Sequence, residues 1–330
     1  MSQDLKHGFI YANGIRMHYV EQGEGPLVVL CHGWPESWYS WRHQMPALAA
    51  AGYRVVAPDQ RGYGLTDAPT AVESYDVLHL AGDLVGLVNA LGEQQAVLMG
   101  HDWGSIVAST TALLRPDMVR ALGLLSVPYL SRGRIRPSAQ FHMATQQRHF
   151  YQDYFQQPNH AERELEEDLR RTFLGLLYTL SGEARIKHNS DSFPEVILGF
   201  NKNTRFIDNI IVPEGLPSWL TEADLNFMVE EFGRSGFRGP INWYRNIDRN
   251  WEITPFLNGA KIPQPTLFLA GALDVALKIL ADQFESLEVN VPKLWKKNLI
   301  PGAGHCAEQE KPEEVNKLLL EFLASCSVGQ

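Results

Sequence analysis

Short apolar runs alternate with amphipathic stretches along most of the chain, a pattern typical of a parallel sheet covered by helices on both faces. The runs that predict buried strands lie at residues 27–30, 53–57, 96–99, 121–127, 266–270 and 297–300. Periodic apolar positions predict a helix at residues 106–114 and another from Pro312. Ahead of the first strand, two apolar segments flank Asn13-Gly14, which predicts a β-hairpin.

Between about residues 128 and 254 this strand pattern stops, and the chain becomes aromatic and helical in character. Leu165, Leu169 and Phe173 recur every four residues, which predicts one helix, with Asn159 as its N-cap. We therefore expect three parts: a first part of a sheet domain at residues 1–128, an inserted helical cap at 129–254 and a second part of the sheet domain at 255–330.

Composition and charge are those of an ordinary globular protein. There are 29 Lys and Arg residues against 38 Asp and Glu residues, a formal net charge of −9. An acidic balance without a basic run disfavours nucleic acid as a partner. No apolar run resembles a signal peptide or a membrane span, so we expect no membrane association and a cytoplasmic location. The three cysteines, Cys31, Cys306 and Cys326, are widely spaced, which favours reduced thiols over disulfides or a metal site.

The most informative segment is residues 100–104, which read Gly-His-Asp-Trp-Gly between a predicted strand and a predicted helix. The two glycines permit a turn tight enough to expose Asp102 at its tip. Asp102 could simply cap the following helix. As a nucleophile, a carboxylate gains little from an acyl carbon, because the product is an anhydride. Attack on a saturated carbon with a leaving group gives an ester that water can then cleave, so the segment favours alkyl transfer followed by hydrolysis.

Other candidate catalytic residues also follow predicted strands. Asp59, Asp274 and His305 join Asp102 at the edge where open α/β sheets bind ligands. His305 is the candidate base that activates water, and Asp274 is the candidate partner that fixes the imidazole tautomer. We expect Asp59 and Arg61 only to brace loops.

Together these segments resemble the soluble epoxide hydrolases of the α/β-hydrolase fold, and the resemblance covers almost the whole chain. It rests on His-Gly-Trp-Pro at residues 32–35, Asp-Gln-Arg-Gly-Tyr-Gly at 59–64, the Asp102 segment, Gly-Phe-Arg-Gly-Pro-Ile-Asn-Trp-Tyr-Arg at 236–245 and Gly-Ala-Gly-His at 302–305. The resemblance implies a mostly parallel sheet flanked by helices, an inserted helical cap, and the chain order nucleophile, acid, histidine.

The resemblance also implies roles for other residues. The backbone N–H groups of Trp34 and Trp103 would bind the oxyanion that forms when water attacks the aspartyl ester. Opening an epoxide produces an alkoxide, which needs a proton donor, and tyrosines remain protonated at neutral pH. Tyr244 and Tyr151 match the ring-opening tyrosines of the family, although Tyr154 lies close enough to be confused with Tyr151.

The aromatic residues of the expected cap suggest an apolar epoxide held under a lid. They are Phe150, Phe155, Trp219, Phe237 and Trp243. The reactants implied by the resemblance are a small-molecule epoxide and water, with no cofactor and no metal. The sequence leaves open whether the protein is a monomer or a homodimer.

Two alternatives share the expected fold. A haloalkane dehalogenase would also use an aspartate nucleophile followed by tryptophan, but Trp34 stands where those enzymes commonly have asparagine, and the tyrosines would be unexplained. A non-enzymatic ligand receptor would not need every catalytic position to be intact. We therefore predict an epoxide hydrolase that forms vicinal diols through an ester on Asp102.

Overall fold

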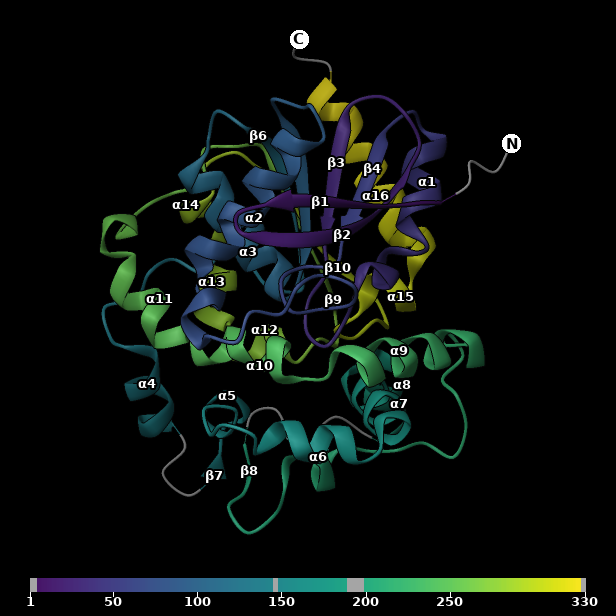
Figure 1. Cartoon of the computed structure of the whole chain (residues 1–330), viewed down its shortest axis with the longest axis vertical. Helices are drawn as coiled ribbons and strands as arrows, with labels where there is room; N and C mark the ends of the chain where they lie inside the picture. The colour runs from purple at the N-terminus through teal and green to yellow at the C-terminus, as the bar shows by residue number, and fades with distance from the viewer. Residues whose placement is uncertain (1–4, 145–147, 189–198, 328–330) are drawn as a thin grey trace.

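The structure is a computed structural model and describes residues 5–144, 148–188 and 199–327. At its centre is an eight-stranded sheet with the strand order β1-β2-β4-β3-β5-β6-β9-β10 (Figure 1). In that order the strands are Lys6–Ala12, Ile15–Gln22, Arg54–Pro58, Leu27–Cys31, Ala96–His101, Val119–Leu125, Thr266–Gly271 and Leu294–Ile300. All six strands expected from apolar runs are therefore confirmed.

Strands β1 and β2 form the expected antiparallel hairpin, with Asn13 and Gly14 both at positive φ in its turn. Strand β2 joins β4 antiparallel, and the pairs from β4 to β10 are parallel. The chain runs outward from β3 to β4 and then places β5 on the other side of β3. Open α/β sheets bind ligands beyond the carboxyl ends of the strands at such a reversal.

The sheet separates two apolar cores, because successive strand residues face opposite sides. Val29 belongs to the core under α2 (Val77–Ala90) and α3 (Trp103–Leu114). Its neighbour Val28 belongs to the core under α1 (Gln44–Ala50) and α16 (Pro312–Ser327). The helices expected near residues 106–114 and from Pro312 are α3 and α16.

Between β6 and β9 the chain leaves the sheet and builds a helical layer, drawn below the sheet in Figure 1. Its elements are α4 (Pro137–Ala144), β7 (Arg148–His149), α5 (Tyr151–Tyr154), α6 (Ala161–Glu167), α7 (Leu169–Leu180), α8 (Gly182–Lys187), β8 (Phe200–Asn201), α9 (Glu222–Ser235), α10 (Arg238–Arg245) and α11 (Ile247–Ile253). Four short helices complete the C-terminal part: α12 (Ala276–Ile279), α13 (Ala281–Glu285), α14 (Leu287–Asn290) and α15 (Ala307–Glu310).

The helix expected from Asn159 through Phe173 starts at a different residue and is interrupted. Asn159 has a φ of 60° and lies outside α6, whose N-cap is His160. The periodic run also contains a break, because Asp168 has extended backbone angles and its side chain accepts the N–H of Arg171 as the N-cap of α7. The sequence therefore forms two helices where we expected one, since an aspartate that can cap competes with helix continuation.

Two further expectations concern the cysteines and membrane spans. Cys31, Cys306 and Cys326 are all free thiols, as expected. Within the three described segments, no helix combines the length and the apolar character that crossing a membrane requires.

Candidate active site

Asp102 stands on a strained turn between β5 and α3. Its φ is 50° and its ψ is −117°, a backbone conformation that non-glycine residues rarely adopt. A Cβ atom at Gly104 would lie 2.0 Å from the carbonyl oxygen of Cys31, and one at Gly100 would lie 2.2 Å from the Gly104 backbone. Only glycine fits at both positions, so the sequence signal of two flanking glycines reflects the close approach of β3, β5 and α3.

Two backbone N–H groups hold the Asp102 carboxylate. The N–H of Trp34 donates to Oδ1 at 2.9 Å, and the N–H of Trp103 also hydrogen-bonds the carboxylate. The Trp34-Pro35 peptide bond is cis. Burial raises the pKa of Asp102 above its usual value, although His305, His101 and the two N–H groups oppose this shift. The two donors expected for an oxyanion hole thus lie at the candidate nucleophile.

His305 connects Asp102 to Asp274. Its Nε2 atom is 3.7 Å from Asp102 Oδ2, and its Nδ1 atom is 3.1 Å from Asp274 Oδ1. The backbone N–H of His305 donates to the carbonyl oxygen of Leu180 at 2.9 Å, which ties this loop to the end of α7. The structure therefore brings together the three residues expected as nucleophile, base and acid.

Ser126 is a further member of this group that the sequence analysis missed. Its hydroxyl donates to Asp274 Oδ2 at 2.6 Å and lies 2.9 Å from His305 Nδ1. The residue follows β6 and has a φ of 66°. In the sequence it lies inside the apolar run at residues 121–127 that predicted a strand, so its place just beyond β6 gave no signal.

The pKa shifts of His305 and Asp274 follow from this geometry. Burial alone would lower the pKa of His305, but the charge and hydrogen bond of Asp274, together with Asp102, outweigh burial and raise it. Burial would raise the pKa of Asp274, but His305, Ser126 and the N–H of Ala276 lower it. Asp274 is thus held as a carboxylate that keeps a proton on His305 Nδ1, which leaves Nε2 facing Asp102.

Two tyrosines of the helical layer face the same space. Tyr151 begins α5 and Tyr244 lies in α10, and their rings are 5.7 Å apart. The amide of Gln152 donates to the Tyr151 hydroxyl at 2.8 Å. Burial, together with the charge of Asp102, raises the pKa of both phenols, so both are protonated at neutral pH. Tyr154 instead donates its hydroxyl to Glu164 and does not line this space.

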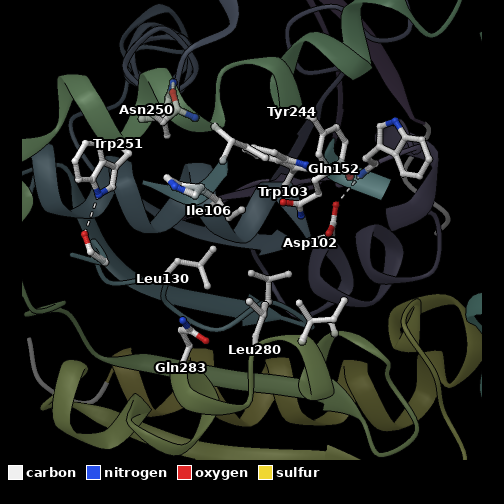
Figure 2. Close-up of a pocket in the computed structure, with 18 of the residues that line it drawn as sticks. Asp102, Trp103, Ile106, Leu130, Gln152, Tyr244, Asn250, Trp251, Leu280 and Gln283 are labelled. Atoms are coloured by element: carbon white, nitrogen blue, oxygen red, sulfur yellow. Dashed lines mark hydrogen bonds between the residues drawn. The ribbon is translucent and has the colours of Figure 1, made fainter. Parts of the chain in front are cut away.

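A cavity of about 610 Å³ lies between the sheet and the helical layer. Asp102, Trp34 and His305 line it from the sheet, and Tyr151 and Tyr244 line it from the helices. Figure 2 shows Asp102 and Tyr244 close together at one end of the cavity, with Trp251 toward the other. Leucine and isoleucine side chains occupy much of the wall between these ends, which suits an apolar ligand.

The aromatic residues expected to contact substrate have different positions. Phe150 lines the cavity, whereas Phe155, Trp219, Phe237 and Trp243 do not. Trp243 is fully buried, and its indole N–H donates to the carbonyl oxygen of Arg61 at 3.0 Å. Phe155 packs behind the wall, with its ring 5.2 Å from that of Tyr244 and 5.3 Å from that of Trp34. Sequence position alone did not separate residues of the wall from residues that support it.

Asp59 and Arg61 brace loops, as expected. Asp59 accepts the N–H groups of Trp38 and Leu65, each at 3.1 Å. Arg61 forms a buried ion pair with Asp83 at 2.6 Å. Neither side chain lines the cavity.

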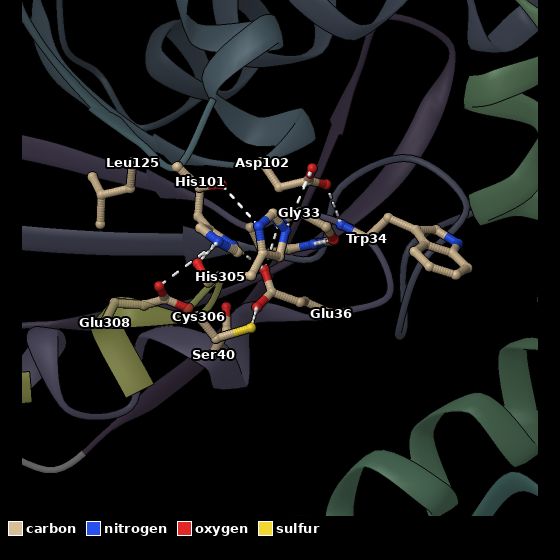
Figure 3. A network of polar contacts seen from close by, with 12 residues as sticks. Gly33, Trp34, Glu36, Ser40, His101, Asp102, Leu125, His305, Cys306 and Glu308 are labelled. Carbon is tan, nitrogen blue, oxygen red and sulfur yellow. Dashed lines mark hydrogen bonds and ion pairs between the residues drawn. The ribbon is translucent and has the colours of Figure 1, made fainter. Parts of the chain in front are cut away.

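Behind His305, on the side away from the cavity, is a buried polar network that the sequence analysis did not predict (Figure 3). His101 Nδ1 is 2.9 Å from Glu36 Oε2, and its Nε2 is 2.9 Å from the main-chain oxygen of His305. Glu36 and His101 are 65 residues apart in the chain, so no local pattern could indicate their contact.

Comparison with known proteins agrees with this geometry. The family model described as alpha/beta hydrolase fold matches residues 26–312. Epoxide hydrolase A of Mycobacterium tuberculosis (strain ATCC 25618 / H37Rv) is 43% identical over 313 residues, which cover 94% of this chain and 95% of that protein. The solved structure of an epoxide hydrolase from an endophytic Streptomyces has a TM-score of 0.92 at 45% identity, covering 97% of this chain and 95% of the other. That of Epoxide Hydrolase A from Mycobacterium thermoresistibile has a TM-score of 0.91 at 44% identity, covering 97% and 98%. The chain therefore belongs to the epoxide hydrolases of the alpha/beta hydrolase fold.

Proposed function

We propose that this protein hydrolyses apolar epoxides to vicinal diols through an ester formed on Asp102. The observation that carries the proposal is the composition of one cavity wall: a carboxylate and an imidazole from the sheet, and two phenols from the helical layer. A carboxylate opposite two protonated phenols suits attack on an oxirane carbon with proton donation to its oxygen. The similarity to epoxide hydrolases over nearly the whole chain supports the same reaction.

In the first step, an oxygen of Asp102 attacks an oxirane carbon. The new C–O bond forms as the ring C–O bond breaks, and the bonding electrons move to the ring oxygen. Tyr151 and Tyr244 hydrogen-bond that oxygen, and one of them gives it a proton. The product is a hydroxyalkyl ester of Asp102.

In the second step, His305 Nε2 takes a proton from water, whose oxygen attacks the ester carbonyl carbon. The N–H groups of Trp34 and Trp103, which hold the carboxylate in the free protein, stabilise the oxyanion. Collapse of this intermediate breaks the bond to the alkyl oxygen, which receives the proton from His305. Asp102 is left as a carboxylic acid, and its proton returns to the ionised tyrosine. This restores the Asp102 carboxylate and the phenol, and the diol leaves.

We also propose that residues 129–254 act as the cap over this site. Both tyrosines come from this stretch, whereas Asp102, His305 and Asp274 come from the sheet domain. Closing the two parts over the substrate would exclude bulk water from the ester.

A dehalogenase would leave part of this site without a function. Expulsion of a halide requires hydrogen-bond donors but no proton transfer, so a dehalogenase would not need two protonated phenols facing Asp102. A receptor would bind ligand without bond breaking, and it would need neither the His305–Asp274 pair nor Ser126.

The test is to assay styrene oxide and a 1-chloroalkane side by side, with the wild-type protein and with Asp102→Ala. We expect diol from styrene oxide, no chloride release, and loss of diol formation in the variant. Chloride release without diol would identify a dehalogenase. Saturable binding without either product would identify a receptor.

A further inference from the structure

We propose that Glu308 is a positioning residue for the second half-reaction: acting through His101, its carboxyl controls how readily the His305 imidazole takes a proton from water. Glu308 lies in α15, behind His305, and does not line the cavity. The inference rests on the proposed function, in which His305 is the base. It adds a group that does not touch substrate.

His101 carries a positive charge in this arrangement. Its Nε2 faces the main-chain oxygen of His305, and a carbonyl oxygen can only accept, so Nε2 bears a proton. Its Nδ1 faces Glu36 Oε2, which also accepts the N–H of Gly33 at 2.7 Å. The other Glu36 oxygen accepts the amide of Gln309 at 3.1 Å. These donors keep Glu36 ionised, so Nδ1 bears a proton as well.

Glu308 has an oxygen that this network leaves unsatisfied. Its Oε2 lies 3.8 Å from His101 Nε2 and has no hydrogen-bond partner among the described residues. Its Oε1 receives the amide of Gln309, at 3.4 Å, and the backbone N–H of Glu308 itself also hydrogen-bonds the carboxyl. The side chain is fully buried, and burial raises the pKa of this carboxyl to about 7. Glu308 therefore changes charge near neutral pH beside the His101 imidazolium.

The route from Glu308 to His305 is short. His101 Nε2 contacts Glu308 on one side and the backbone of His305 on the other, and the two histidine rings are 4.9 Å apart. The titratable or charged groups around Glu308 are His101 on β5, Glu36 after β3, His305 after β10, Cys306 and Glu310 on its own segment, and Arg42, which binds the adjacent Gln309.

The sign of the effect follows from the charges. With Glu308 protonated, the His101–Glu36 pair is neutral overall, and the imidazolium still repels a proton on His305. With Glu308 ionised, the cluster gains one negative charge, which favours the protonated form of His305. A base that holds its proton more strongly removes a proton from water more readily once it is neutral.

The alternative interpretation of this cluster is a metal-binding site. His101, Cys306 and Glu308 place one nitrogen, one sulfur and one oxygen atom within 4.8 Å of one another. Both ring nitrogens of His101 already bear hydrogen-bonded protons, however, so neither offers a lone pair to a metal. Protonation of His101 and Glu308 therefore accounts for the geometry better than metal binding does.

The direct test is to titrate ¹⁵N-labelled histidines by NMR in the wild type and in Glu308→Gln, with His305 assigned from the resonance that His305→Gln lacks. We expect His305 and Glu308 to titrate as a coupled pair in the wild type. In Glu308→Gln, His305 should titrate singly, with its midpoint lowered by roughly half to one pH unit, the size expected for one charge acting through protein. His101 should stay doubly protonated in both, because its two acceptors remain.

The kinetic test separates the two half-reactions with styrene oxide. In Glu308→Gln, the rate of ester hydrolysis should begin to fall at a lower pH than in the wild type, because the pKa of His305 is lower. The rate on the plateau above pH 8 should fall about threefold, since a weaker base takes the proton from water more slowly. The alkylation rate in the same reaction serves as the internal reference. A purely structural role for Glu308 would reduce stability without shifting this fall in rate to lower pH.

Glu310→Gln is the matched control. Glu310 is also buried in α15, but its carboxylate accepts the N–H groups of Gly182 and Gly304 and does not face His101. An unchanged His305 midpoint in Glu308→Gln would overturn the inference, and so would an equal shift in Glu310→Gln. If the wild type forms no diol, the proposed function fails, while the NMR titration still decides the role of Glu308.

Discussion

At the scale of single residues, environment gives two aspartates different properties. Asp274 receives hydrogen bonds from His305, Ser126 and the N–H of Ala276, and together these lower its pKa despite burial. Asp102 is also buried, but its pKa is raised, because burial outweighs the partners that stabilise its charge. A carboxylate whose charge is less well stabilised is the better nucleophile. The one that is tightly held is the better fixed partner for a histidine.

The tyrosines provide a test at the same scale. If Tyr151 and Tyr244 share the developing alkoxide, Tyr→Phe at either position should slow alkylation about 100-fold, within the usual range of general acid catalysis. The double substitution should nearly abolish alkylation, whereas hydrolysis of the ester should be spared. Stopped-flow single turnovers of styrene oxide measure both steps.

Tyr154→Phe is the control for these substitutions. Its hydroxyl binds Glu164 away from the cavity, so its loss should affect stability and leave alkylation close to the wild-type rate. Alkylation that falls with Tyr154→Phe and not with Tyr151→Phe would show that the wrong tyrosine was chosen.

At the scale of elements, the tight junction of β3, β5 and α3 depends on glycine. Gly104→Ala would place a Cβ atom 2.0 Å from the Cys31 carbonyl oxygen, a backbone atom of a central strand that cannot move aside. We expect the substitution to lower the free energy of unfolding by about 2 kcal/mol or more and to remove activity. Gly215→Ala is the matched control, because its Cβ would meet nothing within 4 Å. Equal urea midpoints for the two variants would contradict this account of the turn.

Most elements of the sheet domain were predictable, because a buried parallel strand needs only a short apolar run. The division of residues 161–180 into α6 and α7 was not, since the periodicity continues through Asp168, whose capping role depends on its backbone angles. Ser126 and the Glu36–His101 contact were equally hidden, because each joins segments far apart in the chain. The catalytic candidates were accessible because each follows a strand or belongs to a recognisable motif.

At the scale of the whole molecule, buried ionisable groups make stability depend on pH. Burial raises the pKa of Glu308 and of Glu310 to about 7, above the usual carboxyl value of about 4.5. A carboxyl with a raised folded pKa stabilises the protein fully below its unfolded pKa, and this contribution is lost as the pH rises toward 7. Glu36 behaves oppositely, because its partners, chiefly His101, lower its pKa despite burial, so its contribution is lost in strong acid.

The protein should therefore be more stable at pH 5.5 than at pH 8. We expect the free energy of unfolding to fall by roughly 2–4 kcal/mol across this range, because the pKa values of Glu308 and Glu310 are raised in the folded protein. Urea titrations at the two pH values measure the difference, and Glu308→Gln should reduce it by about half. Stability that is constant or rises from pH 5.5 to pH 8 would contradict the assignment of these two groups.

In the proposed mechanism, the oxygen added to the epoxide comes from Asp102 and not directly from water. A single turnover with excess protein in H₂¹⁸O decides this, with mass spectrometry of the diol and of the peptide that contains Asp102. We expect a diol without label and one ¹⁸O atom in the Asp102 carboxylate, because water attacks the ester carbonyl carbon. Label in the diol and none in Asp102 would contradict it.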